Sequence, residues 1–163
     1  MRIEISKRGN GGGVLRCVRG DGSVTWQKQG GRNAGFFALH DLTHFAVESV
    51  LGFRRGFFGL IAVGWDLEDM SGKGARGALP EEAVEVERIV GLFDTERGSG
   101  VLMTAGEFGE FGPRRLTEEE IARVRARRGE LFEQWRAVEV GGVMELRWES
   151  YSFGMGSGGD IGG

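Results

Sequence analysis

The stretch that decides the fold is residues 36–53, FFALHDLTHFAVESVLGF. It contains no proline, no glycine before Gly52 and many good helix formers, and this composition predicts a helix of about five turns. Leu39, Leu42 and Ala46 lie on one side of that helix, and apolar residues cover most of the remaining surface. The sequence therefore predicts a largely buried helix, on which ionisable side chains form only a narrow stripe.

Strand patterns precede and follow the helical part of the chain. Residues 2–7 alternate in character, with Ile3 and Ile5 on one face, which is the period of a half-buried strand. Two further runs are joined by Gly-Asp-Gly at 20–22, and these residues tolerate the positive φ that a hairpin turn needs. The predicted strands are residues 2–7, 14–19, 23–28 and 143–149.

Two further helices have clear start signals. Pro80 suits the first position of an amphipathic helix that ends near Asp94. Thr117 and Glu120 form a capping box, which opens a helix that runs to about Val138.

Three segments have weaker signals. For residues 57–65, which are apolar but short, we favour a helix over a strand. Residues 66–78 are polar and glycine-rich, and predict a surface loop. Residues 98–113 mix glycines with apolar side chains, so we expect a loop packed over the core, with a mobile lid as the alternative.

This order of elements predicts an α+β fold. We expect a small antiparallel sheet, made of the N-terminal strand, the hairpin and the C-terminal strand, packed on one face by three to four helices. Residues 1–150 would form a single domain, and the glycine-rich residues 151–163 a flexible C-terminal tail. The other sheet face would meet solvent or a partner, including a second copy of the chain. The four tryptophans, Trp26, Trp65, Trp135 and Trp148, are expected to anchor the core.

Composition excludes several classes of protein. Of the 163 residues 40% are hydrophobic and 10% aromatic, which is enough for a buried core and excludes a disordered chain. A single cysteine excludes a disulfide-stapled scaffold. No apolar run has the length of a membrane span and no signal-peptide pattern is present, so we expect a cytoplasmic, prokaryotic protein with no membrane partner. The net charge of −3 argues against nucleic acid as a partner.

The ionisable stripe carries both histidines of the chain. His40, His44 and Glu48 follow one another at intervals of one helical turn and span only about 80° of the helix surface. Asp41 lies beside them. Because an unpaired polar group costs several kcal/mol when it is buried, the stripe must find partners.

Two imidazoles one turn apart can bind one metal ion together, and a carboxylate can complete the site. Glu48 is one candidate for the third ligand, and the acidic cluster Asp66, Glu68 and Asp69 supplies others. We therefore expect a divalent metal, zinc or iron, with an open position for water or a small-molecule ligand. The expected metal ligands are His40, His44, Glu48 and Asp66, and the expected general base is Asp41 or Glu48.

The segment His40-Asp41-Leu42-Thr43-His44 resembles the HExxH signature of zincin metalloproteases, in which the two histidines bind zinc. The resemblance is limited to these five residues, and Asp41 stands where that family has its glutamate base. It therefore implies a metal-dependent hydrolase in outline, without protease activity.

A second interpretation assigns the histidines no chemistry. In it, His40 and His44 form a structural polar network with backbone carbonyls or acidic side chains, and Glu48 pairs with Arg54 or Arg55. The protein would then be a non-catalytic binding or interaction protein. A third interpretation is a metal-free acid–base site, in which a carboxylate fixes the tautomer of a histidine.

Overall fold

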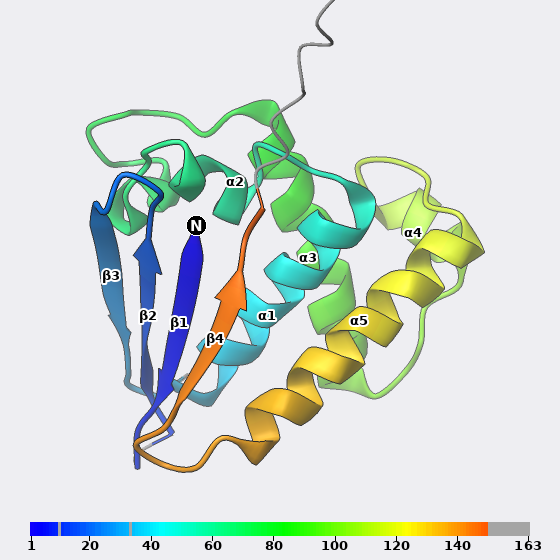
Figure 1. Ribbon diagram of the computed structural model, residues 1–163. Helices are drawn as coiled ribbons and strands as arrows, with labels where there is room; N and C mark the ends of the chain where they lie inside the picture. Colours follow the sequence, from blue (N-terminus) through cyan, green and yellow to red (C-terminus); the bar gives the residue numbers. More distant parts are fainter. Residues whose placement is uncertain (10, 33, 150–163) are drawn as a thin grey trace, which may run out of the picture.

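An antiparallel sheet forms one layer of the protein (Figure 1). The computed structural model describes residues 1–9, 11–32 and 34–149, and within them the sheet has four strands in the order β3-β2-β1-β4. The strands are β1 (Arg2–Lys7), β2 (Gly13–Val18), β3 (Val24–Gln29) and β4 (Val143–Arg147). All neighbours are antiparallel, and Ile5 of β1 lies between Leu15 and Met144. The predicted sheet is therefore confirmed.

Helices occupy most of the chain between β3 and β4. Over the described residues they are α1 (Ala34–Leu51), α2 (Phe57–Ala62), the 3-10 helix η1 (Leu67–Ser71), α3 (Glu81–Ser99), α4 (Ala105–Phe111) and α5 (Glu118–Ala137). The α+β fold and the helix in the segment 57–65 agree with the prediction. None of the helices in these residues combines the length and the apolarity needed to cross a membrane.

The core lies between the sheet and α1. Figure 1 shows α1 beside the inner face of the sheet, and its other neighbours are α3 and α5. Alternate strand residues such as Ile3 and Leu15 point inward and are fully buried, as is Leu42 of α1. Because the sheet, α3 and α5 surround it, α1 is buried along most of its length, and its ionisable side chains are held inside the protein.

The segment 98–113 differs from both predicted forms. Instead of a loop, residues 105–111 form α4, whose N-cap Thr104 accepts a hydrogen bond from the backbone N–H of Glu107. Phe108 is buried and its ring centroid lies 4.8 Å from that of Phe93. The cap and the buried aromatic pair outweigh the low helix propensity of two internal glycines.

Other predicted boundaries are shifted. Pro80 is the N-cap of α3 and precedes its first helical position, and the helix continues past Asp94 to Ser99. The segment 66–78 contains η1. The expectation that Trp26 anchors the core is wrong: it lies on the outer face of β3 and is 57% exposed, because it is paired with the outward-facing Arg16. The predicted tail, 151–163, lies outside the described residues.

Candidate metal centre

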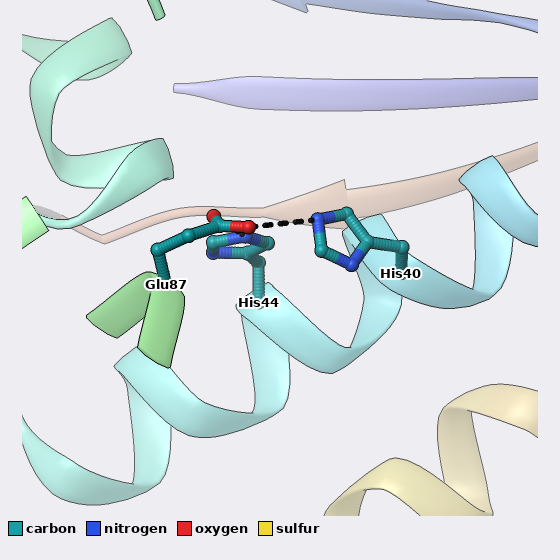
Figure 2. A group of neighbouring side chains, drawn as sticks. All are labelled: His40, His44 and Glu87. Carbon is teal, nitrogen blue, oxygen red and sulfur yellow. Dashed lines mark hydrogen bonds and ion pairs between the residues drawn. The ribbon is translucent and has the colours of Figure 1, made fainter. Parts of the chain in front are cut away.

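Two adjacent helices bring a cluster of acidic and imidazole side chains together. His40 and His44 lie on one side of α1, as their spacing predicts, and both point toward Glu87 of α3 (Figure 2). Asp94, two turns further along α3, lies against His40. The two helices therefore supply matching pairs, His44 with Glu87 and His40 with Asp94.

The packing of α3 fixes the position of its two carboxylates. Val86, Val90 and Phe93 are fully buried and hold one face of α3 against the core. Glu87 and Asp94 follow Val86 and Phe93 directly in sequence, so they lie at the edge of this apolar face, where it meets α1. Their separation of seven residues places them on the same side of the helix.

The two imidazoles face the same kinds of partner. His40 Nδ1 lies 2.7 Å from Asp94 Oδ2, and its Nε2 lies 3.7 Å from Glu87 Oε1. His44 Nδ1 lies 3.2 Å from Glu48 Oε1, and its Nε2 lies 2.9 Å from Glu87 Oε2. Each Nδ1 therefore has a carboxylate of its own, while both Nε2 atoms face the single carboxylate of Glu87.

Aromatic rings hold the imidazoles in place. Phe36 stacks on His40 with a centroid separation of 5.1 Å, and Phe57 of α2 lies 5.0 Å from His44. The two imidazole rings are 4.8 Å apart and nearly perpendicular. Because each ring is packed on one face and hydrogen-bonded at its edge, the direction of each Nε2 is well defined.

The cluster has more negative than positive groups. Three carboxylates, those of Glu48, Glu87 and Asp94, surround two imidazoles, and Arg97 lies 3.3 Å from Asp94. The hydrogen bond with His44 lowers the pKa of the Glu87 carboxyl. Burial opposes ionisation of Asp94, but its bonds with His40 and Arg97 lower its pKa overall. The cluster therefore favours a bound cation, whether a proton or a metal ion.

His44 binds a proton tightly when no metal is present. Burial lowers its pKa, but the hydrogen bonds to Glu48 and Glu87 have the larger combined effect and raise it to about 9. Burial raises the pKa of the Glu48 carboxyl, against the opposing effect of His44. The His44–Glu48 pair therefore retains a proton at neutral pH.

Glu48, predicted as a metal ligand or base, has a different environment from the one we expected. It is fully buried, and besides His44 its oxygens accept the backbone N–H groups of Phe57, Phe58 and Gly59 at 2.9–3.3 Å. A Cβ at Gly56 would lie 2.6 Å from its Cδ, so only glycine fits there. These bonds aim the carboxylate at Nδ1 of His44 and at α2, on the side of the ring opposite Glu87.

Asp41 and Asp66, the other two predicted residues, are bonded to groups other than the imidazoles. Asp41 is buried and accepts a hydrogen bond from Gln29 of β3, and burial raises its pKa to about 6. Asp66 lies 2.9 Å from Arg19. The neighbouring Asp69 accepts the backbone N–H of Asp66 at 3.1 Å. Among the predicted site residues, the structure thus brings together His40, His44 and Glu48.

Sequence reasoning missed Glu87 and Asp94. A signal was present, because acidic residues seven positions apart border the apolar stripe of an amphipathic helix. Periodicity does not show which helix lies against the histidines, so that signal could not be connected to them. The packing of α1 against α3 supplies the connection.

Among the described residues, His40, His44 and Glu87 each offer a ligand atom within 4.8 Å of the other two. The cluster thus has the donor atoms for a metal site, and its Glu87 side chain is 58% exposed, so it can be reached from solvent. In comparisons with known proteins, no family model, no curated protein and no solved structure matches this chain.

Proposed function

We propose that this protein binds a divalent metal ion, zinc or iron, through Nε2 of His40, Nε2 of His44 and the carboxylate of Glu87. The observation that supports this most strongly is the partner of each Nδ1. Histidine ligands of metals almost always donate their other ring N–H to a carboxylate or carbonyl, which fixes the tautomer and orients the ring. Asp94 and Glu48 occupy these positions at 2.7 and 3.2 Å.

The distances fit an ion between the three groups. Zinc at about 2.0–2.1 Å from tetrahedral ligands sets those ligand atoms about 3.3 Å apart. The separations between Glu87 and the two Nε2 atoms are 2.9 and 3.7 Å, on either side of that value. Because the ligand atoms of the group all lie within 4.8 Å of one another, the longest separation would have to shorten by at most about 1.5 Å.

Three protein ligands leave a fourth position for water, an arrangement typical of catalytic zinc. A metal ion there lowers the pKa of the bound water and provides hydroxide near neutral pH. Metal-dependent hydrolysis is therefore the reaction class that we attach to the proposal. In it, Glu48 and Asp94 orient the ligands, and neither Asp41 nor Asp66 binds the metal.

One observation favours the alternative, a structural polar network in a non-catalytic interaction protein. All four ring nitrogens of His40 and His44 already have a carboxylate oxygen within 3.7 Å. A doubly protonated His44 would satisfy Glu48 and Glu87 without a metal. The exposed Trp26 on the outer sheet face would then mark the surface for a partner or a second copy of the chain.

Metal titration distinguishes the two functions. Protein purified without an affinity tag and stripped with a chelator is titrated with Zn²⁺, and with Co²⁺, whose visible spectrum reports tetrahedral nitrogen and oxygen ligands. We expect one ion per chain and a loss of at least 100-fold in affinity in His40→Gln and in Glu87→Gln. Glu130→Gln is the matched control, since this glutamate is 60% exposed and pairs with Arg127 on α5.

Proton release gives a second readout. His44 must lose its Nε2 proton to bind a metal, so below its pKa of about 9 binding should release a proton and strengthen as the pH rises. Calorimetry in buffers of different ionisation enthalpy measures that proton. Absence of stoichiometric metal, with His44→Gln merely less stable, would establish the structural network instead.

A further inference from the structure

The outer face of the sheet, on the side opposite α1, has a regular pattern of side chains. The registers of the strands place them in three rows that cross β3, β2, β1 and β4 in that order. The first row is Val24, Val18, Arg2 and Arg147, the second is Trp26, Arg16, Glu4 and Glu145, and the third is Lys28, Val14, Ser6 and Val143. None of these residues is buried, so no described segment of the chain covers this face.

The half of the face on β3 and β2 is mainly apolar. Trp26 is 57% exposed and Val24 41% exposed, and Val18 lies opposite Val24 in the register. When one face of an antiparallel sheet meets water, the residues on that face are commonly polar. Adjoining apolar side chains on an exposed surface are typical of a site where a protein partner binds.

The half of the face on β1 and β4 is charged, and its charges are sorted by row. Arg2 lies directly opposite Arg147, and Glu4 lies directly opposite Glu145. Like charges opposite each other on neighbouring strands are destabilising. Each arginine instead pairs along its own strand, Arg2 with Glu4 at 3.0 Å and Arg147 with Glu145 at 3.6 Å. This half therefore presents a row of positive charge beside a row of negative charge.

A second copy of the same face is complementary to this pattern. A two-fold axis between two facing sheets, running across the strands between the first and second rows, sets each strand against the same strand of the other copy. Arg2 then faces the partner's Glu4, and Arg147 faces the partner's Glu145 in the same way. The apolar halves also face each other, whereas an axis along the strands would set each apolar half against a charged half.

We propose that this protein forms a homodimer through the outer face of its sheet, with the arginine row of each copy against the glutamate row of the other. A carboxylate has about four acceptor sites, so Glu4 can bind the partner's Arg2 in addition to Arg2 and Arg16 of its own chain. The remaining cation, Lys28, lies near the end of the edge strand β3, at a corner of the face.

The size of the face sets the strength of the dimer. Strands of five or six residues, at about 3.3 Å per residue and about 4.8 Å apart, form a face of roughly 20 Å by 15–19 Å. Such an area belongs with the small interfaces of transient complexes, so we expect a weak and reversible dimer. Because this face lies on the other side of the sheet from the metal centre, either proposal can fail while the other stands.

Sedimentation velocity of the full chain, in the presence of a chelator and over a wide range of protein concentration, tests the dimer. We expect the sedimentation coefficient to rise with concentration toward that of a dimer. Trp26→Gln should weaken association at least tenfold. Phe111→Gln is the matched control, since this ring on α4 is also 57% exposed, and it should leave association unchanged. A chain that stays monomeric at every concentration, or equal effects of the two variants, would overturn the proposal.

Two charge-reversal variants test the facing rows. In Arg2→Glu/Arg147→Glu both rows are negative, and in Glu4→Arg/Glu145→Arg both are positive, so each variant alone should associate at least tenfold more weakly. Mixed in equal amounts they should form a heterodimer, because each row then faces a row of opposite charge. Such recovery also shows that both variants are folded. Undiminished association of either variant alone, or no association of the mixture, would overturn the proposal.

A single-stranded nucleic acid is the other occupant that an exposed tryptophan beside cations would fit. A fluorescein-labelled thymidine oligonucleotide, followed by fluorescence anisotropy, distinguishes it. We expect no binding at concentrations where the chain dimerises. Binding of the oligonucleotide to a chain that stays monomeric, with loss of binding in Trp26→Gln, would make this face a nucleic-acid site and overturn the proposal.

Discussion

Within the described residues two glutamates on helices are buried, and they have very different surroundings. Glu96 of α3 is bonded to Arg125 and Arg128 of α5 and to the backbone N–H of Met103. Glu48 of α1 is bonded to His44, whose other ring nitrogen faces a second carboxylate. Both side chains are almost completely removed from solvent.

The difference lies in the balance of charge and in the kind of cation. Two guanidinium groups, which stay protonated in proteins, more than neutralise Glu96, so that cluster has neither an exchangeable proton nor an excess of acceptors. Around His40 and His44 there are three carboxylates, and the cation that compensates them is a proton that a metal can replace. Burial of a carboxylate therefore does not mark a functional site, whereas an excess of acceptors around imidazoles does.

The largest effect should come from breaking the Glu96 cluster. Glu96→Gln leaves Arg125 and Arg128 without their counter-charge, and removing one partner of a buried pair destabilises by about 3–5 kcal/mol. Urea unfolding measures this loss. Zinc affinity should stay unchanged, and Glu130→Gln, which removes an exposed partner, should change stability by less than about 1 kcal/mol. A loss of metal binding in Glu96→Gln would remove the distinction between the two clusters.

The second effect is the pH dependence of the metal-free protein. The folded pKa of His44, about 9, lies above its ordinary 6.5, so its contribution to stability is complete below pH 6.5 and is lost as the pH rises through 9. The expected loss is about 3 kcal/mol, from the size of that shift. Urea unfolding at pH 6.5 and 9.5 in chelator measures it, and His44→Gln should remove most of it. If the free energy of unfolding falls by the same amount between the two pH values in both proteins, the proton is not held by the His44–Glu48 pair.

The third effect tests the orienting role of Asp94 in the proposed metal centre. Asp94→Asn keeps the shape but removes the charge opposite His40 Nδ1, and loss of such a partner weakens metal binding by about 10–100-fold. Competition with a chelating dye measures the zinc affinity. If Asp94→Asn behaves like Glu130→Gln, Asp94 only contributes to packing.

The smallest effect is expected at Asp66, which the sequence alone predicts as a metal ligand. Its side chain is 59% exposed and pairs with Arg19, which also donates to the carbonyl of Ile61 at 2.7 Å. Asp66→Asn should leave zinc affinity unchanged and shift the free energy of unfolding by less than about 1 kcal/mol. A tenfold loss of zinc affinity in Asp66→Asn would instead show that Asp66 binds the metal.

The strands and the long helix could be predicted because their patterns are local. Ile3 and Ile5 alternate with polar residues, and the pairing of β1 with β2 and β4 buries them as expected. The failures came where a contact distant in sequence decided the outcome. The packing of Phe108 on Phe93 turned an expected loop into α4, and the register of β3 with β2 places Trp26 opposite Arg16 on the outer face of the sheet.

For the candidate site, the sequence by itself determined that His40, His44 and Glu48 share one side of a helix, because helical periodicity depends only on residue spacing. Only the tertiary structure decided their partners. The packing of α3 against α1 brings Glu87 to both Nε2 atoms and Asp94 to His40, and the amides of α2 turn Glu48 to Nδ1 of His44. A local pattern can set the direction of a side chain, but the group that it meets depends on which apolar faces pack together in the core.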